Sequence, residues 1–359
     1  MEPPTPYPLP LPRNVRPIVS IGAGGIVRDA HYPAYRIAGF PVACVFDLDL
    51  PKARKLAQDF GVPRVAATLG EAVRGAPKDA VFDVAVPASA LEQVLAALPE
   101  GAPVLIQKPF GEDLAQARRL LALCRRKGLR AAVNFQLRFA PNIAAARRLI
   151  EAGALGELRE MEVRVAVFMP WHLWSFLERL PRVEILYHSI HYIDLIRSFL
   201  GRPRGVYART LPHPRFPKLA SSRTTAILDY GDTARAVIET NHAHEFGRKH
   251  QESTVTWEGA RGALVAKLGL LLDYPRGEPD ALEGCALGEE GAPGPWQPVP
   301  FEGNWYPHAF IGTMSSLLRH VGGETSELPT RVEDALETMA VAEAAYASSA
   351  GGGAPIPFA

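Results

Sequence analysis

The chain has 359 residues, more than a single hydrophobic core usually supports, so we expect two domains. Its formal net charge of +1, with no run of five like charges, gives no electrostatic reason to expect nucleic acid or an anionic membrane as a partner. Its 47% hydrophobic content is typical of a soluble globular protein, so we expect small-molecule partners. No apolar run approaches the roughly 18 residues of a membrane span, and no basic region followed by a hydrophobic one opens the chain, so we expect a cytoplasmic protein.

The first residues, MEPPTPYPLPLP, place proline at every second position from Pro4 to Pro12. Such a segment cannot form a helix or donate to a central sheet. We expect residues 1–14 to be an extended, proline-rich arm that is either loose or laid on another surface.

A glycine turn follows the first predicted strand. Residues 17–21 are apolar, GAGGIV follows at 22–27, and a helical pattern continues to Ala38. Gly22 permits the tight turn, and Gly24 lets the backbone approach a pyrophosphate, whose charge the helix N-terminus favours. Val27 stands where GxGxxG has its third glycine. The pattern indicates a dinucleotide site.

A second predicted strand, residues 42–46, ends at Asp47. Its distance from Gly22 is typical of a carboxylate that binds ribose hydroxyls. The charge of Asp47 would repel a 2′-phosphate, and Leu48 offers no cation, so we expect NAD, with NADP as the less favoured cofactor. The alternative is that Asp47 is only a turn residue before the helix at 52–60.

Two more strand and helix units follow, with strands at 80–86 and 103–106. Repeated units of this kind predict a doubly wound parallel sheet, whose ligand binds beyond the carboxyl ends of the strands. Gln107 and Lys108 stand at one such end. A lysine between a buried strand and a proline indicates a functional residue.

The domain boundary is predicted near Arg138, which separates an NAD-binding domain at 15–138 from a substrate-binding and oligomerisation domain at 139–359. In the second domain, strands at 158–168, 205–210, 224–229, 234–240 and 252–258 indicate a meander in a mostly antiparallel sheet. Residues 277–299 are rich in Gly, Pro and Glu and are expected to form a long exposed connection.

The stretch YHSIHYID contains His188, His191 and Asp194 at steps of three, within an amphipathic helix predicted for residues 185–200. On a helix His188 and His191 share a face, and Asp194 drifts away from it. The spacing alone leaves a metal site, a proton-transfer site and a polar helix edge as alternatives.

Two aromatic clusters lie before predicted helices, the first of them before this one. PWHLW at 170–174 and NWYPH at 304–308 combine flat rings with hydrogen-bond donors, which suits sugar or polyol rings, and core filling by the tryptophans is the alternative. The stretch NHAH at 241–244 has a metal-like spacing of His242 and His244. No third ligand is visible near it in the sequence, so we expect no metal.

Seven segments in order resemble the Gfo/Idh/MocA family, named for glucose-fructose oxidoreductase, inositol dehydrogenase and a rhizopine-catabolism protein. They are IGAGGIVRDAHYPAYRIAGF, VFDLDLPKARKLAQDFGV, VLIQKPFGEDLAQARRL, VNFQLRFAPNI, ALGELREMEVRV, HSIHYIDLIRSFLG and RVEDALETMAVAEAAY. The resemblance implies an α/β protein with an N-terminal Rossmann domain and a C-terminal α/β domain with a large, mostly antiparallel sheet. It also implies an NAD(P)-dependent sugar or polyol dehydrogenase that forms a homodimer or homotetramer through that sheet.

By the same resemblance, His191 is the acid/base for the reacting hydroxyl, and Lys108, from an E-K-P motif, assists it. Two departures matter: Tyr187 stands where relatives carry an aspartate, and Gln107 replaces the glutamate of E-K-P. Tyr187 cannot orient His191 by charge, so Glu184, His188 or another group does so, or the phenol binds substrate.

The predicted site residues fall into three sets. The catalytic set is Lys108, His191 and Tyr187. The cofactor-binding set is Gly22, Gly24, Gly25, Ile26, Asp47, Leu48, Val86, Pro87, Gln107 and Lys108. The substrate-binding set is Lys108, Trp171, His172, Trp174, Tyr187, His188, His191 and Tyr306. Two other functions known among relatives, NAD-dependent glycoside hydrolysis and non-catalytic regulation by dinucleotide binding, are the alternatives.

Overall fold

The computed structural model describes residues 10–274, 276–288 and 291–352. Within them the chain divides into two compact units. The first unit contains residues 10–140 and 306–339, and the second contains residues 141–305 and 340–352. The sequence-based division assigned all of 139–359 to one domain. The structure instead groups 306–339 with the first unit.

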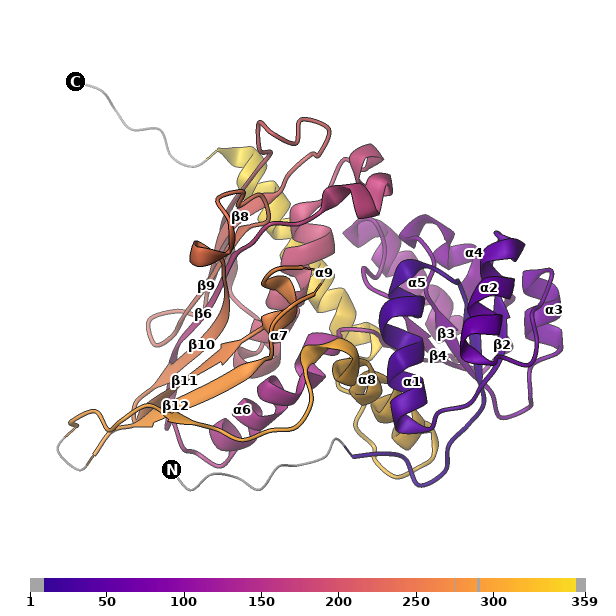
Figure 1. Cartoon of the computed structure of the whole chain (residues 1–359), viewed down its shortest axis with the longest axis horizontal. Helices are drawn as coiled ribbons and strands as arrows, with labels where there is room; N and C mark the ends of the chain where they lie inside the picture. The colour runs from indigo at the N-terminus through magenta and orange to yellow at the C-terminus, as the bar shows by residue number, and fades with distance from the viewer. Residues whose placement is uncertain (1–9, 275, 289–290, 353–359) are drawn as a thin grey trace. The chain divides into compact units, whose positions relative to one another are not determined.

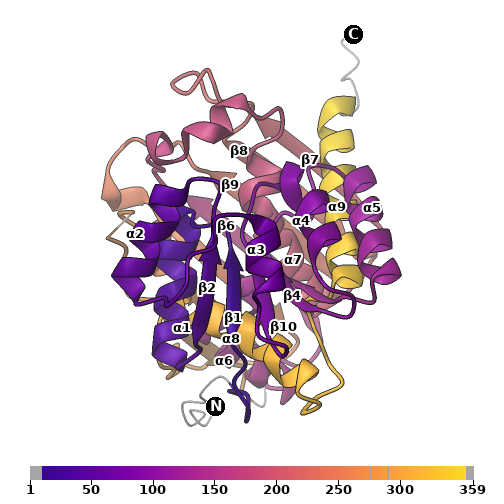
Figure 2. The ribbon, with the colours of Figure 1, turned by 90° about the vertical axis from the view of Figure 1, so that its right-hand side faces the viewer.

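The first unit is built on a five-stranded sheet with the order β2-β1-β3-β4-β5, in which every pair of neighbours is parallel (Figures 1 and 2). The strands are β1 (Ile18–Ile21), β2 (Val42–Phe46), β3 (Val81–Val84), β4 (Pro103–Ile106) and β5 (Arg130–Val133). This sheet confirms the predicted doubly wound parallel fold. Parallel strands leave their carboxyl ends at one edge, so the loops that follow β1 to β4 share that edge.

Helices connect these strands. They are the π-helix η1 (Val27–His31), α1 (Tyr32–Ala38), α2 (Leu50–Phe60), α3 (Leu69–Arg74), η2 (Ala88–Ala90), α4 (Leu91–Ala97) and α5 (Leu114–Arg126), with η3 (Gln136–Phe139) after β5. Asp49, Thr68 and Asp113 cap α2, α3 and α5 with side-chain oxygens that accept backbone N–H bonds. These caps explain why each helix begins where it does.

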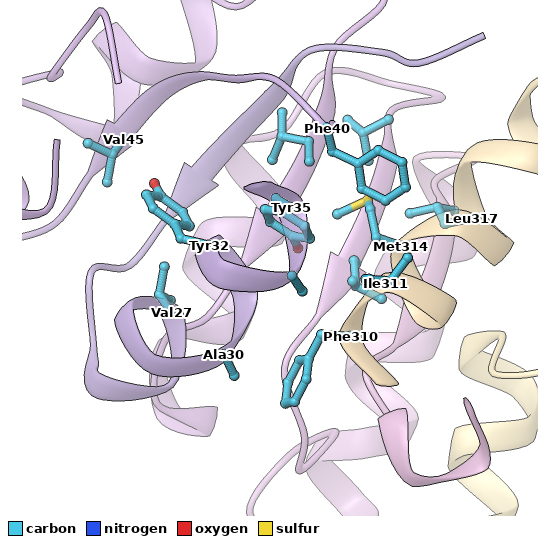
Figure 3. Close-up of a cluster of buried hydrophobic side chains, with 14 of the residues drawn as sticks. Val27, Ala30, Tyr32, Tyr35, Phe40, Val45, Phe310, Ile311, Met314 and Leu317 are labelled. Carbon is cyan, nitrogen blue, oxygen red and sulfur yellow. The ribbon is translucent and has the colours of Figure 1, made fainter. Parts of the chain in front are cut away.

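Helix α8 (Trp305–Val321) explains why residues 306–339 belong to the first unit. Phe310, Ile311, Met314 and Leu317 join the buried cluster that contains Tyr35 of α1 (Figure 3). This apolar face has its partners on β1 and α1. The segment is therefore part of the core of the nucleotide-binding unit, although it lies far away in the sequence.

The second unit contains an eight-stranded sheet with the order β13-β12-β11-β10-β6-β9-β8-β7 (Figure 1). Its strands are β6 (Leu158–Ala166), β7 (Gly205–Leu211), β8 (Arg223–Asp229), β9 (Arg235–Asn241), β10 (Glu252–Gly259), β11 (Gly262–Lys267), β12 (Ala281–Ala286) and β13 (Gln297–Pro298). All its pairs are antiparallel except β6 with β9, so the large, mostly antiparallel sheet is confirmed.

Two details of that sheet correct the prediction. The meander was wrong at β6, which lies between β10 and β9 and runs parallel to β9. A parallel pair needs a crossover, and the helical segment between β6 and β7 supplies it. Residues 277–299 are also not one exposed connection, because β12 and β13 extend the sheet there.

Helices α6 (Pro141–Glu151) and α7 (Ile190–Leu200) lie against the sheet, α6 on β11 and β12 and α7 on β9. The shorter helices are η4 (Trp171–Arg179), the π-helix η5 (Glu184–Ser189), η6 (Arg248–His250) and η7 (Gly269–Leu271), and the last helix is α9 (Val332–Gly351). Across the described ranges, every helix is too short or too polar to cross a membrane.

Residues 1–9 of the proline-rich arm lie outside the described residues. The remaining part of the arm is laid on the first unit. The Pro10 carbonyl accepts a hydrogen bond from Ser315, and the Arg13 N–H donates to Glu324 at 2.7 Å.

Candidate functional site

The glycine turn after β1 is shaped by two glycines with different surroundings. Gly22 has φ of +107°, and a Cβ built on it would lie 2.2 Å from the carbonyl oxygen of Ala85, so only glycine fits. A Cβ on Gly24 would meet no atom of the described chain within 4 Å. The backbone at Gly24 therefore borders open space at the start of a helical segment, which suits the approach of a pyrophosphate.

Asp47 holds this turn. Its Oδ2 accepts the N–H of Ala23 at 2.6 Å, and its Oδ1 accepts the N–H of Asp49 at 2.9 Å. Asp47 therefore does stabilise a turn, which was the alternative predicted from the sequence. This role does not exclude ribose binding, because a carboxylate has about four acceptor positions. The adjacent Leu48 is 93% exposed and supplies no cation.

The other predicted cofactor residues lie at the same sheet edge. Val86 and Pro87 follow β3, and Gln107 and Lys108 follow β4. The Gln107 N–H donates to the Val84 carbonyl at 2.8 Å, which continues the β3–β4 pairing. Its side-chain Oε1 is buried and has no hydrogen-bond partner among the residues that the structure describes. An orphaned acceptor at this edge fits a site that a polar ligand completes.

Lys108 is half-buried where β4 ends. Burial disfavours the charged ammonium and lowers the pKa of Lys108 to about 8. A shift of this kind at the ligand-binding edge of a parallel sheet is typical of a functional residue. Together with the open Gly24 backbone and Asp47, it shows that this unit's own residues fit a bound dinucleotide.

The helix predicted for residues 185–200 has two parts in the second unit. The π-helix η5 contains Tyr187 and His188, and the regular helix α7 contains His191. The π-turn changes the angular spacing, so a face drawn with 3.6 residues per turn does not extend across the junction. His191 is buried, with its ring 6.4 Å from that of Trp305, whereas the ring of Tyr187 lies 6.0 Å from that of Phe176.

Glu184, the first residue of η5, is the centre of a buried polar cluster. Its Oε2 lies 3.2 Å from Nδ1 of His188 and 3.0 Å from Nδ1 of His242. Its Oε1 accepts the hydroxyls of Thr240 at 2.9 Å and Ser189 at 3.2 Å. Both carboxylate oxygens are thus engaged by side chains from η5, β9 and the residues just after β9.

Burial alone would raise the pKa of Glu184, but the neighbouring His242 and His188 outweigh burial and hold the pKa of this carboxyl well below its usual range. Glu184 is therefore a carboxylate at neutral pH. From the sequence, Glu184 was one candidate for the group that orients His191. In the structure, the two carboxylate oxygens of Glu184 instead contact His188, His242, Thr240 and Ser189.

The aromatic residues near η5 have different environments. The Trp171 ring is buried and lies 5.3 Å from His188 and 6.4 Å from His242, which agrees with the core-filling alternative. His172 is exposed, and Trp174 packs at 5.5 Å on Tyr274.

Within the predicted set, the first unit gathers the cofactor residues and Lys108 at one edge, and the second unit gathers Trp171 and His188 around Glu184. Tyr306 belongs to the first unit, where it packs on Phe310. Sequence reasoning gave no role to Ser189 and Thr240. Glu184 and His242 are 58 residues apart in the sequence. The polar residues in each of the two segments were the only feature of the sequence that pointed to this cluster.

The glycine turn, the acidic residue after β2 and the lysine after β4 define a nucleotide-binding oxidoreductase of the Rossmann class. Two family models match the chain: "Oxidoreductase family, NAD-binding Rossmann fold" over residues 17–135 and "GFO/IDH/MocA C-terminal domain" over residues 143–265. The chain belongs to the Gfo/Idh/MocA family of NAD-binding oxidoreductases, as the seven sequence segments indicated.

Curated relatives match nearly the whole chain. The chain is 28% identical over 342 residues to the D-apiose dehydrogenase of Paraburkholderia graminis, which covers 92% of this chain and 86% of the relative. It is 27% identical over 350 residues to the D-apiose dehydrogenase of Rhizobium rhizogenes, with 92% and 94% covered. The chain is thus similar over both units to named dehydrogenases.

Among solved structures, an oxidoreductase from Agrobacterium radiobacter in complex with NAD+, L-tartaric acid and magnesium has a TM-score of 0.77. Its sequence is 20% identical, and the match covers 94% of this chain and 97% of that chain. At this identity the likeness shows a shared fold.

Proposed function

We propose that this protein is a dehydrogenase or reductase that transfers a hydride between NAD and a secondary alcohol or carbonyl of a sugar or polyol. The observation that carries the proposal is Lys108, which lies at the same sheet edge as the glycine turn with its pKa lowered to about 8. The full-length similarity to relatives named D-apiose dehydrogenase supports the substrate class.

The residues that would hold the dinucleotide are those of the turn and the edge. The backbone at Gly24 and Gly25 would receive the pyrophosphate, and Asp47 the ribose hydroxyls, with Ile26, Leu48, Val86 and Pro87 lining the site. Bound NAD+ supplies a hydride acceptor. Asp47 favours NAD over NADP because its charge opposes a 2′-phosphate.

In the oxidation direction, the hydroxyl oxygen of the substrate would lose a proton. We assign that proton to a ring nitrogen of His191, since imidazole titrates near neutrality with an unperturbed pKa of about 6.5. The Lys108 ammonium would donate a hydrogen bond to the same substrate oxygen and stabilise its developing negative charge. An exchange of these two roles is the alternative.

Tyr187 is proposed to bind substrate. A phenol is neutral at working pH, so it donates a hydrogen bond but cannot hold an imidazolium by charge. His172, Trp174 and Tyr306 are proposed as further substrate contacts.

We also propose a homodimer or homotetramer through the eight-stranded sheet. Tyr207 of β7 and Ile227 of β8 are register partners, and both are exposed apolar residues on one face of the sheet.

The function is tested by adding a panel of aldoses, including apiose, and polyols to the enzyme with NAD+ or NADP+ and following reduced cofactor at 340 nm. We expect turnover with NAD+, and a loss of about 10² to 10⁴ in rate for Lys108→Ala and for His191→Ala with NAD binding retained. The exposed Lys78→Ala and His250→Ala are matched controls that should keep native rates.

Two results would overturn the proposal. Release of sugar from glycosides with no net change at 340 nm would favour the hydrolase, and NAD binding without turnover of any panel member would favour a regulator. For Tyr187→Phe we expect a higher KM with a modest change in kcat, since the lost hydrogen bond is present in both ground and transition states. A collapse of kcat at constant KM would place the phenol on the proton path.

A further inference from the structure

We propose that Glu184, His188 and His242 form a binding site for one divalent first-row transition metal ion, with Zn²⁺ as the reference ion. The three residues come from η5 and from the position just after β9, and all belong to the second unit. Their ligand atoms lie within 4.8 Å of one another. This inference is independent of the hydride-transfer proposal, because metal binding can be measured without cofactor or substrate.

The distances fit adjacent positions around one ion. In the tetrahedral geometry typical of Zn²⁺, bonds of about 2.1 Å to histidine nitrogen and carboxylate oxygen place neighbouring ligand atoms about 3.4 Å apart. The two observed separations from Oε2 of Glu184 are 3.2 Å to His188 and 3.0 Å to His242. The imidazole centroids are 4.3 Å apart, which is also close enough for two rings on one ion.

The chemistry of the ligand set selects the class of ion. Two imidazoles and one carboxylate suit Zn²⁺, Fe²⁺ or Co²⁺, whereas Mg²⁺ and Ca²⁺ prefer oxygen ligands alone. Without metal, each Nδ1 can donate its hydrogen to Glu184. Metal binding requires both Nδ1 atoms as lone-pair donors, so these protons move to the Nε2 atoms or to solvent.

A second layer of hydrogen bonds prepares the carboxylate. Thr240 and Ser189 donate to Oε1, which turns Oε2 towards the two histidines. Supporting bonds of this kind are typical of metal sites, where they fix the orientation of a ligating group. The site thus has its carboxylate oriented before any ion enters.

Burial would restrict but not close the access of an ion. The side chains of Glu184 and His242 are 0% and 2% exposed, whereas that of His188 is 19% exposed. The buried Trp171 ring packs beside both histidines. The partly exposed His188 is therefore the ligand through which an ion would reach the cluster.

This proposal departs from the sequence-based expectation of no metal site. That expectation rested on the lack of a third ligand near His242 and His244 in the sequence. Folding brings Glu184 and His188 to His242. His244 is not a member of this cluster, and its ring packs on Phe246 at 5.6 Å, so it serves as a matched control two residues away.

The test uses the full chain, dialysed against a chelator and then titrated with Zn²⁺ in equilibrium dialysis with elemental analysis. We expect one Zn²⁺ per chain, and Co²⁺ should give visible absorption bands that Zn²⁺ abolishes. His188→Ala and His242→Ala should weaken Zn²⁺ binding at least about tenfold, and Thr240→Val by about 10- to 100-fold. His244→Ala should bind as the native protein does.

His188→Ala is the decisive variant, because His188 is the least buried ligand and its loss disturbs folding least. Circular dichroism checks that each variant is folded. The proposal is overturned if the native protein binds no Zn²⁺ stoichiometrically, which would make the cluster a hydrogen-bonded one alone, or if folded His188→Ala binds Zn²⁺ as tightly as native. Neither cofactor nor substrate enters the measurement, so its failure leaves the hydride-transfer proposal untouched.

Discussion

The ammonium of Lys108 has a pKa of about 8 because burial removes water from around its charge. Its proposed role needs the cation, and the proposed role of His191 needs neutral imidazole. We therefore predict that kcat/KM falls as the pH rises through about 8, where Lys108 loses its proton. A second, lower limb is expected on the acid side, where protonation removes the proton-accepting nitrogen of His191.

The variant Lys108→Arg distinguishes a role for the positive charge of Lys108 from a role for Lys108 in proton transfer. Arginine keeps its charge at every accessible pH, so the upper limb should disappear in any activity that remains. An unchanged upper limb in that variant would assign it to another group. Loss of all activity in Lys108→Arg with NAD binding intact would favour the exchanged assignment, with Lys108 in the proton path.

Asp47 combines two functions that one substitution can separate. Asp47→Ala should narrow the preference for NAD+ over NADP+ in kcat/KM, because the charge that opposes a 2′-phosphate is gone. It should also lower the free energy of unfolding by about 1 to 3 kcal/mol, because the N–H groups of Ala23 and Asp49 lose a charged acceptor. Kinetics with both cofactors and urea unfolding measure the two effects.

Asp49→Ala is the matched control for this pair of measurements. Asp49 caps α2 by accepting the Lys52 N–H at 3.1 Å, so its loss should cost about 0.5 to 2 kcal/mol and leave the cofactor ratio unchanged. Native enzyme that uses NADP+ as well as NAD+ would contradict the role given to Asp47.

At the scale of elements, a buried polar network joins several segments of the first unit. Asp83 of β3 accepts from Tyr35 of α1 at 2.9 Å and lies 2.8 Å from Nδ1 of His31. Asn134, just after β5, lies 3.2 Å from Nε2 of His31 and accepts the hydroxyl of Thr313 of α8 at 2.8 Å. The network therefore ties α8 to the parallel sheet.

Tyr35→Phe should lower the free energy of unfolding by about 1.5 to 3 kcal/mol, because it removes one hydrogen bond to a buried side-chain carboxyl and keeps the ring. Urea unfolding measures this value. The exposed Lys78→Ala should change stability by less than about 0.5 kcal/mol. Equal stability of native and Tyr35→Phe would show that the hydroxyl adds nothing to the network.

The elements that the sequence predicted well are those whose signal is local. Strand β4 was predicted with its observed bounds, since a short apolar run ends at a polar pair. The position of β6 could not be predicted in this way, because pairing with β9 depends on a crossover of many residues. Strands β12 and β13 were not predicted, because the glycine and proline residues of this segment are typical of a loop.

The candidate site residues also divide into those with a local sequence signal and those whose position depends on long-range folding. Gly22, Asp47 and Lys108 follow directly on predicted strands, and the topology of a parallel sheet places them at one edge. The Glu184 cluster depends on the π-turn of η5 and on the end of β9, so no sequence spacing indicates that His188 and His242 meet. His244, which has a metal-like spacing to His242 in the sequence, is not a member of this cluster.

At the scale of the whole molecule, stability is linked to the cofactor. A ligand that binds only the folded protein stabilises it by about 2.7 kcal/mol at a concentration of 100 times Kd. The two glycines of the turn should respond differently. Gly22→Ala places a Cβ 2.2 Å from the Ala85 oxygen and strains a positive φ, so it should destabilise the protein even without NAD.

Gly24→Ala should leave the free energy of unfolding without NAD close to native, because its Cβ enters open space. The same methyl group occupies the place where the backbone would approach the pyrophosphate, so we predict that Kd for NAD rises at least about tenfold. At the NAD concentration that stabilises native protein by about 2.7 kcal/mol, the variant should then gain about 1.4 kcal/mol or less. Urea unfolding with and without NAD measures both values. A Gly24→Ala protein that keeps the full stabilisation by NAD would show that the pyrophosphate is bound elsewhere than at this turn.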